Sequence, residues 1–550
     1  MTQITVDDSI PDLCGKTFVL EPYGSCTLEL AISGPVSSDC GSSDNPCLFV
    51  CMSDGFTCAG TKHPLEVKTA AFPVAGGVYY PTDAGSTPML AAMTSSSGDK
   101  WDFSIDVNGP LPSDLADGVF IGTDCTGNAC LAVGGYLGSE NYSNVYPMIA
   151  VSQKGGAKNS WSYAIDSADV PSDYVGFGFF SNIDCSGEIC VASGQYETET
   201  NTYPLLAVST KSGATGSWTY ETSPYPNGIF NSVSCDGDLC IVGGQYGNGS
   251  TLYPLLLVNT DISGGGTWEP VIDSTHDTLP SDFANNGILF SVACSGQTCI
   301  AGGQYENSGA NSGYYPLLVM SSNVENGDWD YVISSTGLPE DGVANGDNEF
   351  NFIKGTSCSG GICLAGGNYV TNANNYPILL VNTNASTSDT WTPVVTSDED
   401  SLPTAYGTNG AFFAVSCSGE ICAAAGGYED DGGIDAPILY VNIAVESGTW
   451  SYAVDDSNNL PDKFSQGGSF YGVTCNAVMC MAEGYYADNE SVPNYYGMVA
   501  VNMAISTDED NEHWQYPIDI NNVPSDYGTD GNGFGLFCGT TYPVCNNSYF

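Results

Sequence analysis

Arginine is absent from this 550-residue chain, and lysine is scarce. Nine lysines stand against 63 aspartates and glutamates, so the formal net charge is -54 at pH 7. Such a chain cannot neutralise phosphate groups in number, and its composition therefore excludes nucleic acid as a partner and does not favour binding to an anionic membrane. The same charge favours solubility and attracts cations and basic partners.

Long apolar runs and helical periodicity are missing as well. No run of 18 or more apolar residues occurs, so the sequence predicts no membrane span. Histidine occurs only at His63, His276 and His513, in positions that do not correspond to one another, and no Ser-His-Asp triad stands out. A hydrophobic content of 42% nevertheless places the chain among folded proteins.

Cysteine, in contrast, is abundant and regularly spaced. Fourteen of the 22 cysteines form seven C-x4-C pairs, and Cys538 and Cys545 lie near the end of the chain. Zinc ribbons use closer pairs and often histidine, so the spacing predicts disulfides and an oxidising compartment, which means a secreted, extracellular or cell-surface protein. The seven pairs are Cys125/Cys130, Cys185/Cys190, Cys235/Cys240, Cys294/Cys299, Cys358/Cys363, Cys417/Cys422 and Cys475/Cys480.

One unit repeats along most of the chain. Eight tryptophans mark its register at intervals of 50 to 64 residues, from Trp101 to Trp514. Each tryptophan opens a short strand, an apolar strand often introduced by Tyr-Pro precedes it, and the cysteine pair closes a hairpin of two more strands. Four antiparallel strands repeated eight times predict an all-β, eight-bladed β-propeller.

The ends of the repeat region predict a closed ring. Residues 71–79 match the second hairpin strand but have no cysteine pair before them, and residues 533–538 match the missing first strand. We therefore expect residues from about 530 to 550 to complete the first blade, within a propeller that spans residues 67–550. Residues 1–66 hold six cysteines outside the repeat and predict a small disulfide-rich β cap, in which fifteen connectivities are open.

The turns ahead of several tryptophans resemble degenerate Asp boxes, the sialidase-type (BNR) repeat. Examples run from Ser209 to Trp218, from Asn259 to Trp268 and from Ser506 to Trp514, with Asp261 and Asp508 near the aspartate position. Together with the cysteine hairpins, these turns resemble the repeats of secreted bacterial propeller proteins. The resemblance implies structural turns on the face opposite the ligand site. Sialidases hold their substrate with an arginine triad, so the absence of arginine excludes that activity.

The two faces of the predicted ring have different roles. Cysteine turns and Asp-box-like turns should share one face, because alternate turns of an antiparallel blade lie together. The opposite face should carry variable acidic loops, such as residues 197–202 and 429–435, and blade-to-blade loops with a Leu/Val-Pro-x-Asp pattern. Loops on a rigid scaffold are where recognition usually occurs. The blade-to-blade loops are residues 111–114, 279–282, 338–341 and 523–526.

These observations favour a non-catalytic recognition or adhesion propeller that binds a carbohydrate or protein ligand on its acidic loop face. One alternative is a structural subunit of an extracellular fibre or surface layer, which would self-associate. Another is a carbohydrate-active hydrolase other than a sialidase, because paired carboxylates are inevitable among 63 acids.

Two sets of side chains are candidates for binding. Asp430, Asp431, Asp435, Asp508 and Asp510 offer hard oxygen ligands in acidic loops and are candidates for calcium, the one cofactor that the sequence suggests. A tyrosine that follows the glycines of the hairpin could line a carbohydrate platform or pack between blades, and packing is the favoured interpretation. These residues are Tyr136, Tyr196, Tyr246, Tyr305, Tyr369 and Tyr428.

Overall fold

The structure is a computed structural model that describes residues 73–519 with short gaps, and five short strands outside that range. The chain divides into two compact units, Met1–Thr69 and Ala70–Phe550. The gaps are residues 80–84, 96–97, 99, 107–108, 141–142, 222, 276–278, 309–312, 335–350, 372–373, 389–390, 399–400, 446–449, 455–459, 462–463, 466, 477–478, 489–494 and 504–513.

The first unit is described only as two small antiparallel sheets. Strand β1 (Gln3–Thr5) pairs with β2 (Ala31–Ser33), and β3 (Phe49–Cys51) pairs with β4 (Cys58–Gly60). The other features of the predicted cap, including its disulfide connectivity, lie outside the described residues.

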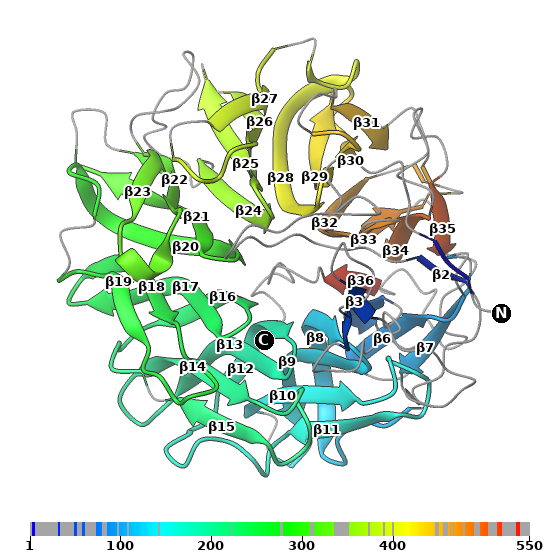
Figure 1. The fold of residues 1–550 in the computed structure, drawn as a ribbon, viewed down its shortest axis with the longest axis vertical. Coiled ribbons are helices and arrows are strands. Elements are labelled where there is room, and N and C mark those ends of the chain that lie inside the picture. The colour runs from blue at the N-terminus through cyan, green and yellow to red at the C-terminus, as the bar shows by residue number, and fades with distance from the viewer. Residues whose placement is uncertain are drawn as a thin grey trace. The chain divides into compact units, whose positions relative to one another are not determined.

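The second unit is an all-β, eight-bladed propeller, as the sequence predicts. Its blades are antiparallel sheets that follow one another around the ring in chain order (Figure 1). The innermost strands of blades 2 to 8 are β8 (Leu115–Thr126), β12 (Gly178–Ser186), β16 (Ile229–Asp236), β20 (Phe283–Ser295), β24 (Phe352–Ser359), β28 (Tyr406–Ser418) and β32 (Gly468–Cys475).

The second strand of each blade carries the second cysteine and the glycine-tyrosine motif, except in blade 1. These strands are β5 (Val74–Tyr79), β9 (Ala129–Gly138), β13 (Ile189–Glu197), β17 (Leu239–Asn248), β21 (Thr298–Asn307), β25 (Ile362–Thr371), β29 (Ile421–Asp430) and β33 (Cys480–Ala487).

The third strands are the apolar ones, and they are buried along almost their whole length because neighbouring blades cover both of their faces. They are β6 (Thr87–Met93), β10 (Val145–Ser152), β14 (Thr202–Ser209), β18 (Thr251–Asn259), β22 (Tyr314–Ser321), β26 (Asn374–Asn382), β30 (Asp435–Asn442) and β34 (Tyr495–Asn502).

The outermost strands are short and partly exposed, and each begins at its tryptophan or one residue later. They are β7 (Trp101–Ile105), β11 (Trp161–Ile165), β15 (Trp218–Glu221), β19 (Glu269–Ile272), β23 (Asp330–Ile333), β27 (Trp391–Val395), β31 (Ser451–Val454) and β35 (Gln515–Ile518). A 3-10 turn, η1 (Val324–Asn326), lies between β22 and β23. In the described part of the chain, no helix has the length and apolarity that crossing a membrane requires.

Three strands of the first blade, β5, β6 and β7, come from the beginning of the propeller sequence. Strand β36 (Gly535–Cys538), from the other end of the chain, pairs antiparallel with β5, so that Gly535 lies opposite Tyr79. Residues 530–534 and 539–550 lie outside the described residues, so the prediction that the whole C-terminal segment completes this blade stays open.

A shared apolar core joins the last blade to the first. Tyr79 and Met89 of blade 1 are buried in one cluster with Tyr486 and Met498 of blade 8. Each of these side chains is at most 1% exposed. The last blade therefore packs on the first, and β36 also contacts β33 and β34 at this junction.

Candidate functional site

The cysteine turns and the turns ahead of the tryptophans lie on the same face of the ring. In six blades, a backbone N–H of the second turn donates a hydrogen bond to a backbone carbonyl of the cysteine turn. This arrangement is the one that the sequence predicts for an antiparallel blade. The donor and acceptor pairs are Gly155 and Asn128, Ser212 and Glu188, Ile262 and Asp238, Val324 and Gln297, Ala385 and Gly361, and Val445 and Glu420.

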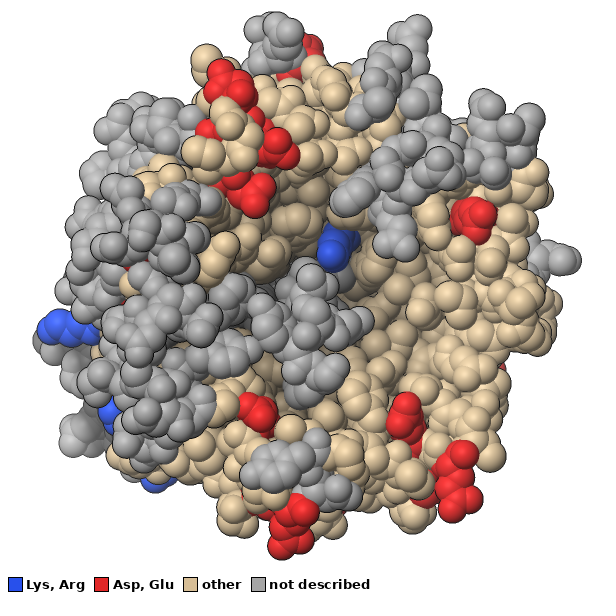
Figure 2. All heavy atoms as spheres, turned by 180° about the vertical axis from the view of Figure 1, so that it is seen from behind, with Lys and Arg blue, Asp and Glu red and all other residues tan. Residues whose placement is uncertain are grey.

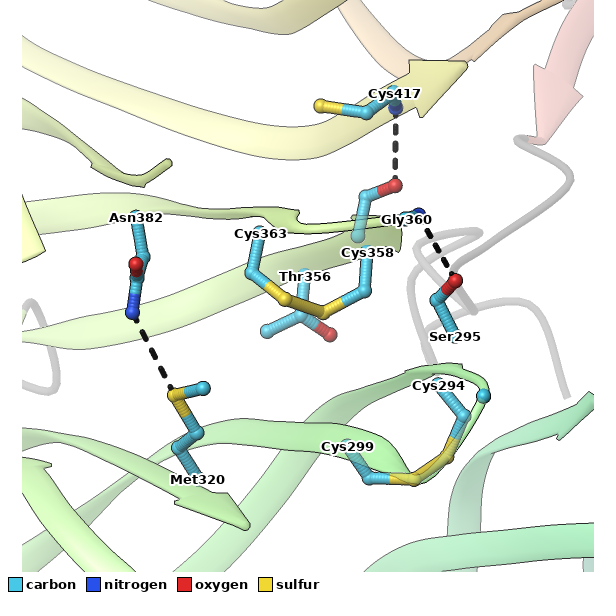
Figure 3. Close-up of a disulfide and its surroundings, with 12 residues drawn as sticks. Cys294, Ser295, Cys299, Met320, Thr356, Cys358, Gly360, Cys363, Asn382 and Cys417 are labelled. Carbon is cyan, nitrogen blue, oxygen red and sulfur yellow. Dashed lines mark hydrogen bonds between the residues drawn. A yellow bond between two sulfur atoms is a disulfide. The ribbon is translucent and has the colours of Figure 1, made fainter. Parts of the chain in front are cut away.

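All seven C-x4-C pairs are disulfides, with Cα atoms 4.1 to 4.2 Å apart. Each joins the first strand of a blade to the second, at directly opposed positions such as Cys358 and Cys363 (Figure 3). No described cysteine is free. Seven disulfides indicate an oxidising environment. The bonds are Cys125–Cys130, Cys185–Cys190, Cys235–Cys240, Cys294–Cys299, Cys358–Cys363, Cys417–Cys422 and Cys475–Cys480.

The second cysteine of each bond is part of the apolar core and not of a site that a ligand could reach. All seven of these side chains have no exposed surface, and each belongs to a buried hydrophobic cluster. The spacing along the chain predicts the bond but not this burial, which results from the cover of the neighbouring blades. The disulfides therefore stabilise the scaffold. The buried cysteines are Cys130, Cys190, Cys240, Cys299, Cys363, Cys422 and Cys480.

The last predicted pair is different, because Cys545 and the side chain of Cys538 lie outside the described residues. A disulfide between them stays a prediction.

Hydrogen bonds between blades reinforce the cysteine face. In five blades, the backbone N–H of the first cysteine donates a hydrogen bond to a side chain of the preceding blade. That side chain belongs to the residue just before the preceding blade's own first cysteine. A second series runs to the turn glycines, as between Gly360 N–H and Ser295 Oγ at 3.0 Å (Figure 3). The first series comprises Cys185 to Asp124, Cys235 to Asp184, Cys294 to Ser234, Cys417 to Ser357 and Cys475 to Ser416.

Two acceptors of the first series, Asp124 and Asp184, are carboxylates whose pKa values are raised. Burial raises the pKa of Asp184 to about 6, although its hydrogen bonds from the N–H groups of Cys235 and Cys185 oppose the rise. Burial also raises the pKa of Asp124, and the negative charge of Asp184 adds to the rise. Both carboxylates serve the inter-blade contacts, so we assign them a structural role.

The tyrosines that follow the hairpin glycines pack between blades and do not form an exposed platform. Tyr136, Tyr305 and Tyr369 are fully buried, and Tyr196, Tyr246 and Tyr428 are at most 8% exposed. Their hydroxyl groups reach the blade-to-blade loops. Tyr136 donates to Asp114 at 3.2 Å and Tyr305 to Asp282 at 3.0 Å. The aspartates of the Leu-Pro-x-Asp pattern therefore fix these loops to the blades.

Replacing Tyr305 with phenylalanine tests this contact. We expect Tyr305→Phe to lower the free energy of unfolding by about 1 kcal/mol, because one hydrogen bond to a carboxylate is lost while the ring keeps its packing. Tyr315→Phe is the matched control, since Tyr315 stacks on the same ring but lies partly exposed. Chemical denaturation of both variants measures the difference, and equal stability would remove the role assigned to Asp282.

Three of the predicted calcium ligands, Asp430, Asp431 and Asp435, lie in and beside the turn between β29 and β30. The Asp430 carboxylate is used by its own turn, where Oδ1 accepts hydrogen bonds from the N–H groups of Gly432 at 2.9 Å and Ile434 at 2.8 Å. Partial desolvation, followed by the charges of Glu429 and Asp430, raises the pKa of Asp435. Within the described residues, no three acidic, histidine or cysteine side chains form a group that could hold a metal ion.

Several predicted positions lie outside the described residues. They include Asp508 and Asp510, all three histidines, and the loops 338–341 and 523–526. Calcium binding at Asp508 and Asp510 therefore stays a prediction.

The centre of the ring holds a set of residues that the sequence analysis did not single out. In blades 2 to 8, the pairing of the two inner strands skips one residue of the innermost strand, four positions before the first cysteine. A β-bulge of this kind re-aims a side chain at the free edge of a sheet. The bulge residues are Ile121, Ser181, Asn231, Phe290, Lys354, Phe413 and Tyr471.

Lys354 is the basic member of this set. Its ammonium nitrogen lies 5.8 Å, 5.5 Å and 5.3 Å from the ring centroids of Phe290, Phe352 and Phe413. Burial lowers the pKa of Lys354 to about 8, so that at neutral pH the side chain is still mostly protonated. Figure 2 shows the face opposite to that of Figure 1, with acidic side chains around the rim and one basic side chain in a central hollow.

Comparison with known proteins finds similar solved structures but does not identify a family for this chain. No family model matches the chain, and no curated protein matches it. A polysaccharide lyase of family PL25, an ulvan lyase bound to -[GlcA(1-4)Rha3S]-, is 11% identical with a TM-score of 0.39, over 70% of this chain and 93% of that one. YCF48 bound to D1 peptide is 12% identical with a TM-score of 0.35, over 66% and 89%.

A sialidase from Trypanosoma rangeli is 14% identical with a TM-score of 0.33, over 61% of this chain and 56% of that one. Each of these TM-scores is below 0.5. Similarity at this level assigns no activity and no ligand to this chain.

Proposed function

We propose that this protein is a secreted or cell-surface recognition propeller without catalytic activity, whose acidic loop face binds a carbohydrate or protein ligand. The observation that carries the proposal is the contrast between the two ends of the second strand. At the cysteine face, the turn from the first to the second strand has the same length in six blades, as between β8 and β9. On the loop face, the connection to the third strand differs from blade to blade.

The loop-face connections vary in length and in composition. Only residues 249–250 join β17 to β18, whereas residues 488–494 join β33 to β34. The connection between β29 and β30 is acidic, and Asn409 Nδ2 donates to Glu429 Oε2 beside it at 2.8 Å. Variation on top of an invariant scaffold is the arrangement in which proteins usually place recognition.

The acidic character of the ring suits a neutral or basic ligand. With a net charge of -54, long-range repulsion slows the approach of polyanions and favours uncharged sugars or basic protein surfaces. Disulfides and inter-blade hydrogen bonds hold the scaffold, so the binding face would be ordered before the ligand arrives, which lowers the entropic cost of binding.

A binding screen with a loop variant tests the proposal. We expect the protein to bind at least one member of a glycan array or a panel of basic extracellular proteins without cleaving it. Replacing residues 431–434 with the Gly249-Ser250 turn of blade 4 should change that binding at least tenfold, and the temperature of unfolding should stay within about 2 °C because the loop lies outside the core.

Three outcomes contradict the proposal. Cleavage of a bound glycan would favour the alternative of a carbohydrate-active hydrolase. Filaments or sheets in electron micrographs of the purified protein, with no ligand bound in the screen, would favour the structural subunit. Unchanged binding in the loop variant and in equivalent variants of the other described connections would remove the ligand from the loop face.

A further inference from the structure

Six of the seven bulge residues at the centre of the ring fall into two groups, and the seventh, Ile121, is buried. In blades 3 and 4 they join neighbouring blades, since Ser181 Oγ donates to the carbonyl of Phe230 at 2.6 Å and Asn231 Nδ2 donates to that of Leu289 at 2.9 Å. Both side chains are buried. The bulge residues of blades 5 to 8 are instead aromatic or basic and partly exposed. One side of the centre is thus built from contacts between blades, and the other side presents side chains to the opening.

The partly exposed side forms a continuous aromatic wall around one cation. Phe290, Lys354 and Phe413 come from three successive blades, and Phe413 contacts Tyr471 of the fourth at a centroid distance of 5.4 Å. Phe352 closes the wall beneath the ammonium. Aromatic faces stabilise a cation and also pack against the apolar faces of sugar rings.

The Lys354 ammonium has no anionic partner among the described residues, although the chain holds 63 acidic side chains. Removal from water is the one cause of its lowered pKa, and no described carboxylate opposes it. Three aromatic rings offset only part of the cost of removing an ammonium group from water. An ammonium group that lies among aromatic rings without a counter-ion is suited to pairing with an anionic group of a ligand.

Two buried amides near this wall have unused hydrogen-bond acceptors. Asn368 lies directly opposite Phe352 in the sheet, is 2% exposed, and its Oδ1 has no partner. Gln304 holds the corresponding position in blade 5, is 8% exposed, and its Oε1 has no partner. Buried acceptors are normally satisfied, so an unused pair indicates a missing donor such as a hydroxyl group.

We propose that Lys354, the rings of Phe290, Phe352 and Phe413, and the amide of Asn368 form a binding site in the centre of the ring for a small sugar acid. The carboxylate would pair with the ammonium, an apolar face of the sugar would lie on the rings, and hydroxyl groups would donate to the amide oxygen. A single cation suits a monoanion, and the acidic chain disfavours a polyanion. This site is separate from the loop face and does not depend on it.

Isothermal titration with sodium glucuronate, and with glucose as the uncharged counterpart, tests the site in the full chain. We expect glucuronate to bind at least tenfold more tightly than glucose, a difference of about 1.4 kcal/mol. Lys354→Met should weaken glucuronate binding at least tenfold and leave glucose unaffected. Lys211→Met is the control, because Lys211 is exposed on the cysteine face, and it should bind glucuronate as the wild type does.

The result that overturns the proposal is the same glucuronate affinity in Lys354→Met and wild type, or no binding by the wild type. Lys354→Gln provides a second variant in case the methionine substitution perturbs folding, and circular dichroism of both checks that the ring has formed. Asn368→Leu should weaken glucuronate binding without changing the binding of acetate, which has no hydroxyl groups. Equal losses for both ligands would exclude the amide from the site.

Discussion

Gly367→Ala is expected to lower the free energy of unfolding by about 3 kcal/mol, at the upper end of what overpacking costs. A Cβ atom at Gly367 would lie 1.9 Å from the backbone carbonyl oxygen of Phe352. Backbone atoms of a paired strand cannot move aside as the end of a flexible side chain can. The substitution must therefore displace one of the two inner strands of blade 6.

The crowding at Gly367 explains why a glycine stands in this position of every cysteine-bearing repeat. In the bulged innermost strand, the carbonyl of the residue two positions before the bulge lies against the second strand, where only a hydrogen atom fits. At each of the seven positions, a Cβ atom would come within 2.0 Å of that carbonyl oxygen. The seven glycines are Gly134, Gly194, Gly244, Gly303, Gly367, Gly426 and Gly484.

Gly361→Ala is the control for this prediction. Gly361 lies in the cysteine turn of the same blade, has no positive φ, and has open space around the position of an added Cβ atom. We expect this variant to unfold within about 0.5 kcal/mol of the wild type, as surface substitutions usually do. Chemical denaturation followed by circular dichroism compares the two variants. Similar stability of both would show that the bulge does not constrain the second strand.

Asp184→Ser is expected to stabilise the protein at neutral pH, by about 1 to 3 kcal/mol, since each pKa unit corresponds to about 1.4 kcal/mol. Serine holds the same position as Ser234, Ser357 and Ser416 in other blades, where it accepts the equivalent hydrogen bond without a charge. The substitution also removes the negative charge that raises the pKa of Asp124.

The effect of Asp184 on the free energy of unfolding depends on pH. Folding raises the pKa of Asp184 from 3.8 to about 6, so between these values the folded state binds more protons than the unfolded state. The free energy of unfolding therefore falls as pH rises from about 4 to about 6, and the loss persists above pH 6. Asp184→Ser should unfold at the same temperature as the wild type near pH 4 and at a higher temperature than the wild type at pH 7.

Thermal unfolding of wild type and variant at the two pH values measures this effect. Asp431→Ser serves as the control, because it removes the same charge from an exposed turn, and it should unfold as the wild type does. An Asp184→Ser variant that is less stable than the wild type at both pH values would show that the carboxylate stabilises the inter-blade contact more than its burial destabilises it.

The architecture could be predicted because its determinants are local and repeated. Cysteine spacing locates each inner hairpin, a tryptophan locates each outer strand, and the apolar run between them locates the strand that both neighbouring blades cover. The buried tyrosines follow from the same repetition, since a residue that recurs once in each blade usually packs. The third strands, such as Tyr314–Ser321, lie where the apolar pattern places them.

The central wall could not be predicted because a β-bulge has no pattern of its own in the sequence. Without the bulge, Lys354 would be one residue of an alternating strand, with no reason to meet Phe290 and Phe413. One signal was available. When the repeats are aligned on the first cysteine, the position four residues earlier varies from serine to lysine to phenylalanine within an otherwise regular strand. Contacts between blades, such as Asp184 with Cys235, also depend on geometry that spacing along the chain does not carry.

The protein is a closed ring of eight blades in which blade 8 packs on blade 1. Electron cryomicroscopy of the intact protein, viewed along the ring axis, tests it most directly. Eight radial sheets with continuous density between the last blade and the first would agree with the buried cluster of Tyr79, Met89, Tyr486 and Met498. A different number of sheets, or an open gap between the first and last of them, would contradict it.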